Sequence, residues 1–432
     1  MIIRDGYRAC KNRLPDTRHV DVLDGIRALA IFIVAWYHIW QQSWLWPILR
    51  LDVVTGQAQF GLLSLWGNLQ LQLNFDPLVR SGYIMVDLML LISGFLLFLP
   101  HARHMVEGER LPGVKDFYLK RAVRILPSYW LSVFVVLFCF ALPRQEYPNA
   151  LALWRDLLSH LTFTHVFWYE SYVATSLNVV LWTLAIEVQF YLVFPLLARA
   201  FVKKPWLTWA VMAAAGLAFR RFAVAPHADT TLWVNQMPTF LDVYANGMLA
   251  AWGYVWLVKR FKHTRATRIL CTLAALMLLW PIWQIIRTQA ASDGFEAIRI
   301  NQARHRFAFS ALCCLFILAS ANAGALWRYL LSNRVMRVGA AVSMQFYIWH
   351  QFIAVQLRRW RFPPSQALLP NEAGEQPWQW YFTLCAFGIP LVLSLLLTYG
   401  FERPIARAVL AWYKRRAAGR VENKQKRVEE TA

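Results

Sequence analysis

Ten apolar runs separated by polar and basic segments dominate this 432-residue sequence. They lie at about 26–46, 82–100, 128–143, 181–201, 206–219, 238–258, 268–286, 306–327, 338–357 and 378–400. A helix of roughly 20 apolar residues spans a hydrocarbon layer of about 30 Å and satisfies its own backbone hydrogen bonds. The runs therefore predict an all-α polytopic membrane protein with about ten transmembrane helices.

Basic residues are distributed unevenly between the two sides of the predicted bundle. With the N-terminus inside, 32 of the 45 Lys and Arg residues fall on the cytoplasmic side and 13 on the outer side. This asymmetry is typical of membrane proteins and predicts that both termini are cytoplasmic. The formal net charge of +21 thus indicates topology rather than nucleic-acid binding. Two outer segments, Arg287 to Arg306 and Arg358 to Arg361, carry more arginines than this rule expects.

One transmembrane domain is predicted between two basic segments. Residues 1–25 form a basic cytoplasmic leader, residues 26–404 the transmembrane domain, and residues 405–432 a charged cytoplasmic tail. The outer segment 144–180 is rich in aromatic and polar residues, which predicts an ordered or interfacial cap. We expect His160 and His165 in this cap to be surface residues.

Arg27 and His38 stand eleven residues apart in the first run, LDGIRALAIFIVAWYHIW. Eleven helical steps are close to three full turns, so both side chains share one face and lie about 16 Å apart along the axis. If Arg27 lies at the membrane edge, His38 lies about halfway into the hydrocarbon layer. An ionisable side chain at that depth is costly, and this makes the pair a candidate functional site.

A second basic group precedes the third run, in DFYLKRAVRILPSYW. Arg121 and Arg124 are three residues apart on one helical face, and Lys120 is adjacent. Paired guanidinium groups at a membrane entrance suit a phosphate-bearing ligand, because each can donate two parallel hydrogen bonds to an oxyanion. Binding of lipid headgroups is the simpler alternative.

Three carboxylates and a second histidine also lie within apolar runs. Asp87 is in the second run, Glu187 in the fourth and Asp242 in the sixth. Each should face a polar cavity or a charged partner, for which Arg27 is an obvious candidate. His350, in the ninth run, is expected near the outer end, where polar anchors are normal.

Six segments taken in order resemble the acyltransferase-3 family of integral-membrane O-acyltransferases. They are LDGIRALAIFIVAWYH, VDLMLLISGFLL, FYLKRAVRILPSYW, LWTLAIEVQFYLVFPLL, VGAAVSMQFYIWHQF and YGFERP, and they extend from residue 23 to about 404. The family's essential arginine and histidine correspond to Arg27 and His38, and its R-x-x-R motif to Arg121 and Arg124. Thr183 replaces the usual Ser of the fourth-run motif, and Val188 replaces its second Glu.

The resemblance implies transfer of an acyl group, most often acetyl, from cytoplasmic acyl-CoA to a hydroxyl group. The sequence shows no metal-ligand spacing, so we expect no metal. The acceptor would be a sugar of a bacterial surface glycan or of a lipid-linked precursor, or else a small molecule, which implies the bacterial cytoplasmic (inner) membrane. The CoA phosphates would dock on Arg121 and Arg124, with Lys120 nearby, and Arg27 would mark the route inward.

His38 would act as general base or carry the acyl group covalently. Glu187 or Asp87 would orient its ring, and the sequence does not choose between them.

A proton-coupled transporter is the rival function, because buried carboxylates and a histidine also occur in proton relays. The sequence shows no repeat symmetry and no pair of Gly/Pro-broken helices in matching halves, which a transporter would favour. The acceptor and the oligomeric state stay open.

Overall fold

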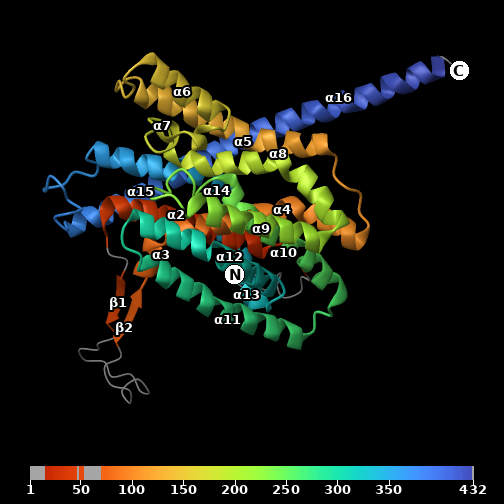
Figure 1. Ribbon diagram of the computed structural model, residues 1–432, viewed down its shortest axis with the longest axis horizontal. Coiled ribbons are helices and arrows are strands. Elements are labelled where there is room, and N and C mark those ends of the chain that lie inside the picture. Colours follow the sequence, from red (N-terminus) through yellow and green to blue (C-terminus); the bar gives the residue numbers. More distant parts are fainter. Residues whose placement is uncertain (1–14, 46–47, 53–69, 431–432) are drawn as a thin grey trace.

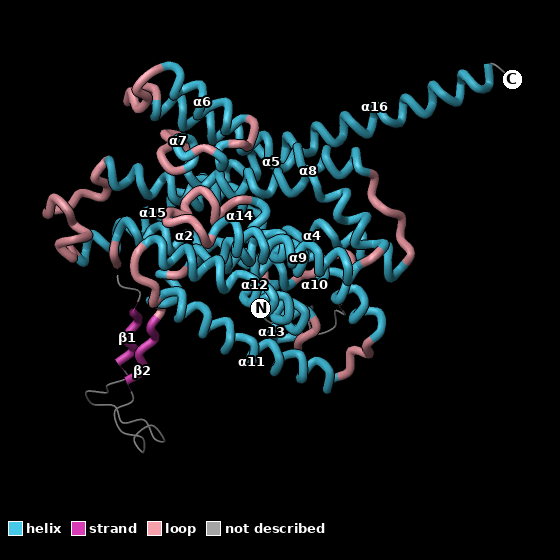
Figure 2. The backbone as a smooth tube through the Cα atoms, viewed as in Figure 1, coloured by secondary structure: helices cyan, strands magenta, loops and turns pink. Residues whose placement is uncertain are grey.

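The computed structural model describes residues 15–45, 48–52 and 70–430, and the chain there is almost entirely helical (Figures 1 and 2). The long helices are α2 (Val22–Ser43), α4 (Met85–Glu107), α5 (Val114–Val136), α8 (Trp182–Lys203), α9 (Pro205–Phe219), α10 (Leu241–Arg260), α11 (Arg265–Ala290), α12 (Phe295–Ala321), α14 (Arg334–Arg359), α15 (Gln376–Leu397) and α16 (Arg403–Glu430). The short helices are α3 (Asp76–Arg80), α6 (Ala150–Leu161), α7 (Tyr169–Tyr172) and α13 (Ala325–Ser332). Strands β1 (Ile48–Asp52) and β2 (Gln70–Asn74) form one antiparallel hairpin.

Eight helical segments of the described chain are long and apolar enough to cross a membrane. They are Val22–Ser43, Gly82–Glu107, Val114–Ala141, Val179–Lys203, Pro205–Val224, Arg265–Ala290, Phe295–Ala321 and Gln376–Arg416, and each overlaps one predicted run. The other two runs, 238–258 and 338–357, coincide with α10 and α14. These helices carry more polar residues, such as Asn246 and Gln345. An all-α polytopic membrane protein is thereby confirmed, and the number of crossings stays a prediction.

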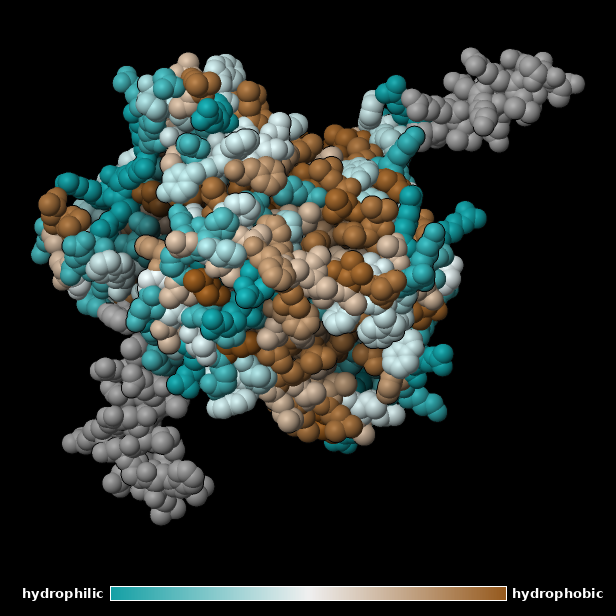
Figure 3. Space-filling model, viewed as in Figure 1, coloured by the Kyte–Doolittle hydropathy of each residue, from teal (hydrophilic) through white to brown (hydrophobic). Residues whose placement is uncertain are grey.

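Along its long axis the molecule has a polar region at each end and an apolar region between them. Hydrophobic residues gather over the middle of the face in Figure 3, and hydrophilic residues gather at its left and right ends. Helices α6 and α7 and the hairpin lie at the left end, and the α4–α5 connection and α16 lie at the right end (Figure 1). This arrangement agrees with the predicted outer cap and cytoplasmic tail on opposite sides of a membrane. Residues 1–14 of the predicted leader lie outside the described residues.

Several helix ends follow from residues suited to capping. Gly108 ends α4 with a left-handed φ of 73° that costs glycine nothing. Thr264 Oγ1 accepts from the Thr267 backbone N–H at the start of α11, at 3.2 Å. Asn333 Oδ1 accepts from the Met336 N–H at the start of α14, at 3.1 Å. These caps fix the turns that lead into the bundle.

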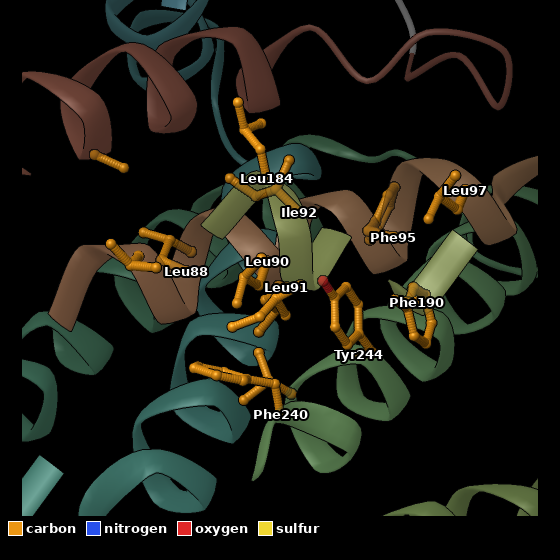
Figure 4. Packing of buried hydrophobic residues seen from close by; sticks show 14 of the residues in the cluster. Leu88, Leu90, Leu91, Ile92, Phe95, Leu97, Leu184, Phe190, Phe240 and Tyr244 are labelled. Atoms are coloured by element: carbon orange, nitrogen blue, oxygen red, sulfur yellow. The ribbon is translucent and has the colours of Figure 1, made fainter. Parts of the chain in front are cut away.

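Helix α4 lies at the centre of the core and crosses α10 closely. A Cβ at Gly94 would lie 2.8 Å from the Tyr244 carbonyl oxygen, and one at Gly247 would lie 2.3 Å from that of Leu91. Only glycine permits these two backbones to approach so closely. Beside the crossing, the rings of Phe190 and Tyr244 stack with centroids 3.6 Å apart (Figure 4).

Helix α14 packs along α2, and both run from the predicted cytoplasmic end to the predicted outer end. A Cβ at Gly339 would lie 3.0 Å from the Ala28 Cβ, so small residues set the spacing where the two helices meet. Ten residues beyond Ala28 is His38, and eleven beyond Gly339 is His350. The parallel packing thus brings the two histidines to the same level.

Candidate active site

A polar cavity of about 60 Å³ lies inside the bundle between α2, α4, α5, α8 and α14. That volume would hold a few water molecules. The polar side chains that line it are Arg27, Ser93, Arg121, Arg124, Thr183, Glu187 and Tyr347. Four of the seven predicted site residues, Arg27, Arg121, Arg124 and Glu187, therefore converge on one space, although they come from three separate helices.

The cavity has an excess of positive charge. Arg27 interacts electrostatically with Arg124 and Glu187, and Glu402 interacts with Arg27 and Arg124. The residues that line the cavity include three guanidinium groups and one carboxylate, Glu187, so the lining carries an excess of positive charge. Asp24 and Glu402 interact with Arg27 from outside the lining. Arg121 Nε is buried and has no hydrogen-bond partner among the described residues. A buried donor without a partner is costly, which favours an anionic ligand at this position.

Glu402 is a cavity neighbour that residue-level sequence reasoning missed. It ends a π-helical turn (Thr398–Glu402) between α15 and α16, and its Oε2 accepts from Gln345 Nε2 at 3.1 Å. Gln345 also donates to Ser128 Oγ at 2.6 Å, which links the turn to α14 and α5. In the sequence, Glu402 belongs to the YGFERP segment of the family resemblance, but no role was predicted for its carboxylate.

Lys120 does not join this cluster. Its side chain is exposed and does not line the cavity, because it lies one position away from Arg121 on the helix. Arg121 instead lies over the rings of Phe117 and Tyr191, at 5.9 Å and 5.8 Å from their centroids. These ring contacts hold the guanidinium group in the bundle.

His38 lies beyond the cavity, and its hydrogen bonds indicate which ring nitrogen carries the proton. Its Nδ1 lies 3.2 Å from Gln41 Oε1, while Gln41 Nε2 donates to the Tyr37 hydroxyl at 2.9 Å. Because a carbonyl oxygen only accepts, Nδ1 must donate, which leaves a lone pair on Nε2. The neutral ring is thus oriented to accept a proton at Nε2.

His350 was expected to be an outer anchor, but it is fully buried against His38, with ring centroids 5.3 Å apart. Its Nδ1 donates to the backbone oxygens of Phe346 and Tyr347, at 3.1 Å and 2.8 Å, so its Nε2 also holds a lone pair. This Nε2 has no partner among the described residues. Tyr347 lines the cavity and lies 5.6 Å from the His350 ring, so these two rings connect the cavity to His38.

Neither carboxylate proposed to orient His38 contacts its ring in the part of the chain that the structure describes. Asp87 is buried and forms an ion pair with Arg306, with Oδ2 3.3 Å from Nε. Arg306 also donates to the backbone oxygen of Val234 and to Thr239 Oγ1. This buried ion pair explains why Asp87 occurs in an apolar run. It also explains Arg306, which the topology rule had placed in an outer loop.

Asp242 also forms an ion pair with a buried arginine. Both of its oxygens accept from Arg220, which also donates to the Thr239 backbone oxygen. The two ion pairs meet at Thr239, whose carbonyl and hydroxyl oxygens serve one arginine each. Asp87 and Asp242 therefore belong to a charge-balanced structural network, separate from the arginine-lined cavity.

The expectation that His160 and His165 lie on the surface is wrong. Both are buried in the cap, and their rings stack at 4.0 Å with 6° between planes. Asp156 holds this region together, because its carboxylate accepts from the hydroxyls of Tyr147 and Thr175, both at 2.9 Å. Its Oδ1 also lies 3.1 Å from His160 Nδ1.

We expect the cap to lose stability as the pH falls below about 6.5. Burial, and then the neighbouring His160, lower the pKa of His165 well below its ordinary value. At a pH between the ordinary histidine pKa and the lowered pKa of His165, the unfolded cap binds a proton that the folded cap excludes. Acid therefore favours unfolding of the cap. After correction for the slower intrinsic exchange at low pH, the protection of the amides of residues 150–172 against hydrogen exchange should be lower at pH 5 than at pH 7.5. His165→Phe keeps a stacked ring without titration, and an unchanged pH dependence in that variant would contradict the assignment.

Comparison with known proteins finds a family match and several relatives. A family model described as an acyltransferase domain matches residues 20–399. The chain is 24% identical over 211 residues to the peptidoglycan O-acetyltransferase of Listeria monocytogenes, covering 46% of this chain and 28% of that protein. It is 22% identical over 351 residues to a Staphylococcus aureus protein named "Putative O-acetyltransferase", covering 77% and 50%. The chain thus spans half or less of the length of these relatives. No solved structure matches it.

Proposed function

The chain belongs to the acyltransferase family that it resembles, and from this membership and the arginine-lined cavity we propose that it moves an acetyl group from cytoplasmic acetyl-CoA to a hydroxyl of a sugar. The acceptor is a bacterial surface glycan or its lipid-linked precursor, and the site of action is the cytoplasmic (inner) membrane. The observation that carries the proposal is the convergence of Arg27, Arg121 and Arg124 on one cavity, which Tyr347 and His350 connect to His38.

The donor docks at the arginine cluster. A CoA nucleotide carries several phosphate charges, and guanidinium groups bind such oxyanions through paired, charge-assisted hydrogen bonds. Arg121 and Arg124 lie in the first half of α5, which begins at Val114 after the predicted cytoplasmic loop. The excess positive charge and the unpartnered Arg121 Nε support this assignment.

The transfer step uses His38 as general base. The acceptor hydroxyl gives its proton to Nε2 while its oxygen attacks the thioester carbonyl carbon, and a tetrahedral intermediate forms. Collapse of the intermediate breaks the carbon–sulfur bond, and the CoA thiolate takes the proton from the imidazolium. The Gln41 carbonyl holds Nδ1–H and stabilises the charged ring, the role that the sequence had given to a carboxylate.

The acceptor approaches from the outer side. His38 lies about 16 Å beyond Arg27 along α2, toward the end that carries the cap. A hydroxyl from outside and a thioester from the cytoplasm can therefore meet near His38 without either substrate crossing the whole bilayer. The Listeria relative is named for peptidoglycan, a carbohydrate acceptor, which supports a sugar here.

Incubation of the purified protein in vesicles with acetyl-CoA labelled in the acetyl group tests this function. We expect label to appear in an added glycan acceptor, or as free acetate if water replaces it. A covalent acyl-enzyme would instead leave label on the protein. Substrate uptake into sealed vesicles without any loss of acetyl-CoA would support the proton-coupled transporter and contradict the proposal.

Replacing Arg121 and Arg124 together by glutamine should raise the KM for acetyl-CoA by about 100-fold or more, because each charge-assisted hydrogen bond contributes about 1.5–3 kcal/mol. Steady-state kinetics at varied donor concentration measure the change. Lys120→Gln is the matched control, since Lys120 carries the same charge next to Arg121 but lies outside the cavity. An unchanged KM in the double variant would remove the arginines from the donor site.

A further inference from the structure

A second, apolar cavity of about 570 Å³ lies on the flank of the bundle between α9, α10 and α12. Its walls include Trp206 and Trp209 of α9, Trp252 and Trp256 of α10, and Leu315 and Leu318 of α12. Two of these side chains, Trp206 and Leu315, are more than half exposed. In a membrane this surface faces lipid, so the cavity is a groove open to the bilayer.

The groove reaches through about one leaflet. Along α10 it extends from Asn246 to Trp256, ten residues or about 15 Å of helix. The hydrocarbon layer is about 30 Å thick, so the groove covers roughly half of it. Trp256 lies one turn before the predicted cytoplasmic end of α10, which places the groove in the cytoplasmic leaflet. Its inner end is closed by Asn246, whose amide is satisfied by Trp209 Nε1 and Ser310 Oγ.

The cytoplasmic end of the groove is basic. Arg260 follows Trp256 by four residues, and Lys203 and Lys204 precede Trp206 at the α8–α9 corner; all three side chains are exposed. The rings of Trp206 and Trp252 meet at 5.6 Å, which places the start of α9 beside α10 about two turns before α10 ends at Arg260. Lys259 is paired with Glu107, but this one acid leaves the other cations available. Such a cluster attracts a phosphate at the membrane surface.

We propose that the groove binds an anionic phospholipid of the cytoplasmic leaflet, with an acyl chain along the tryptophans and its phosphate between Lys203, Lys204 and Arg260. The exposed cations at the cytoplasmic end of the groove favour a phosphate-bearing lipid over a second transmembrane helix. The site is separate from the arginine-lined cavity, because none of the helix residues that form the groove line that cavity.

Native mass spectrometry of the detergent-purified full chain tests the site, using phosphatidylglycerol as the probe. The filling variant is Gly253→Phe with Ala311→Phe, and the headgroup variant is Lys203→Gln with Lys204→Gln. A Cβ at Gly253 would meet only Leu318, at 3.8 Å, so the added ring can occupy the groove. Leu384→Phe on the exposed face of α15 and Lys120→Gln are the matched controls.

We expect the filling variant to bind phosphatidylglycerol at least 10-fold more weakly than the wild type, and both controls to bind it equally well. The headgroup variant should lose the preference for phosphatidylglycerol over phosphatidylcholine. Equal binding by the filling variant would overturn the proposal, and so would preferential binding of a polyprenyl phosphate. The readout does not depend on acyl transfer, so failure of the proposed enzymatic function would leave it intact.

Discussion

Replacing His38 by alanine is expected to lower the rate of acyl transfer by about 100-fold to 10,000-fold, while the protein still accumulates in the membrane. The His38 Nε2 lone pair is the proposed proton acceptor, and removal of the ring leaves the acceptor hydroxyl without a base. The ring is half-buried and its main contacts are Gln41, Tyr37 and His350, so truncation should cost little packing energy. The labelled acetyl-CoA assay measures the loss.

His101→Ala is the matched control for this variant. His101 is a buried imidazole on α4 that lies between the rings of Phe98 and Phe194 and does not line the arginine-lined cavity. Its loss should leave kcat within about threefold of the wild type, provided that the yields of folded protein match. Full activity in His38→Ala would eliminate both the general-base and the covalent mechanisms.

The sequence predicted the helices well because membrane-spanning segments are encoded locally. Run length and polarity are properties of neighbouring residues, so eight predicted runs overlap apolar helices of the structure. The third run was placed too late, at 128–143, because Lys120, Arg121 and Arg124 made the first half of Val114–Ala141 look like a loop. In the structure Arg121 and Arg124 line a cavity inside the bundle, so a membrane helix can contain them.

The site was predicted in part. Arg27, Arg121, Arg124 and Glu187 converge as expected, because each was a costly charge that needed a polar space. The His38–His350 contact could not be derived, since it depends on how closely α2 and α14 pack at Ala28 and Gly339. Helical periodicity places a residue on a face, but it does not say which distant helix covers that face.

Replacing Asp87 by leucine is expected to destabilise the protein by about 3–5 kcal/mol, because it leaves the buried Arg306 guanidinium without its counter-charge. Arg306 has no exposed surface around its side chain and cannot reach water. It would keep its bonds to Val234 and Thr239 and its position over the Phe240 ring, 4.0 Å from the centroid, but none of these carries a negative charge. Thermal unfolding in detergent measures the loss.

The double variant Asp87→Leu with Arg306→Leu should be more stable than Asp87→Leu alone, because both charges leave together. Asp293→Leu, at an exposed carboxylate, is the control for loss of an acid and should change stability by less than about 0.5 kcal/mol. Independent, additive effects of the two substitutions would show that the pair is not coupled. Asp87→Asn separates structure from chemistry: a folded variant that loses transfer would restore the catalytic role that the ion pair with Arg306 argues against.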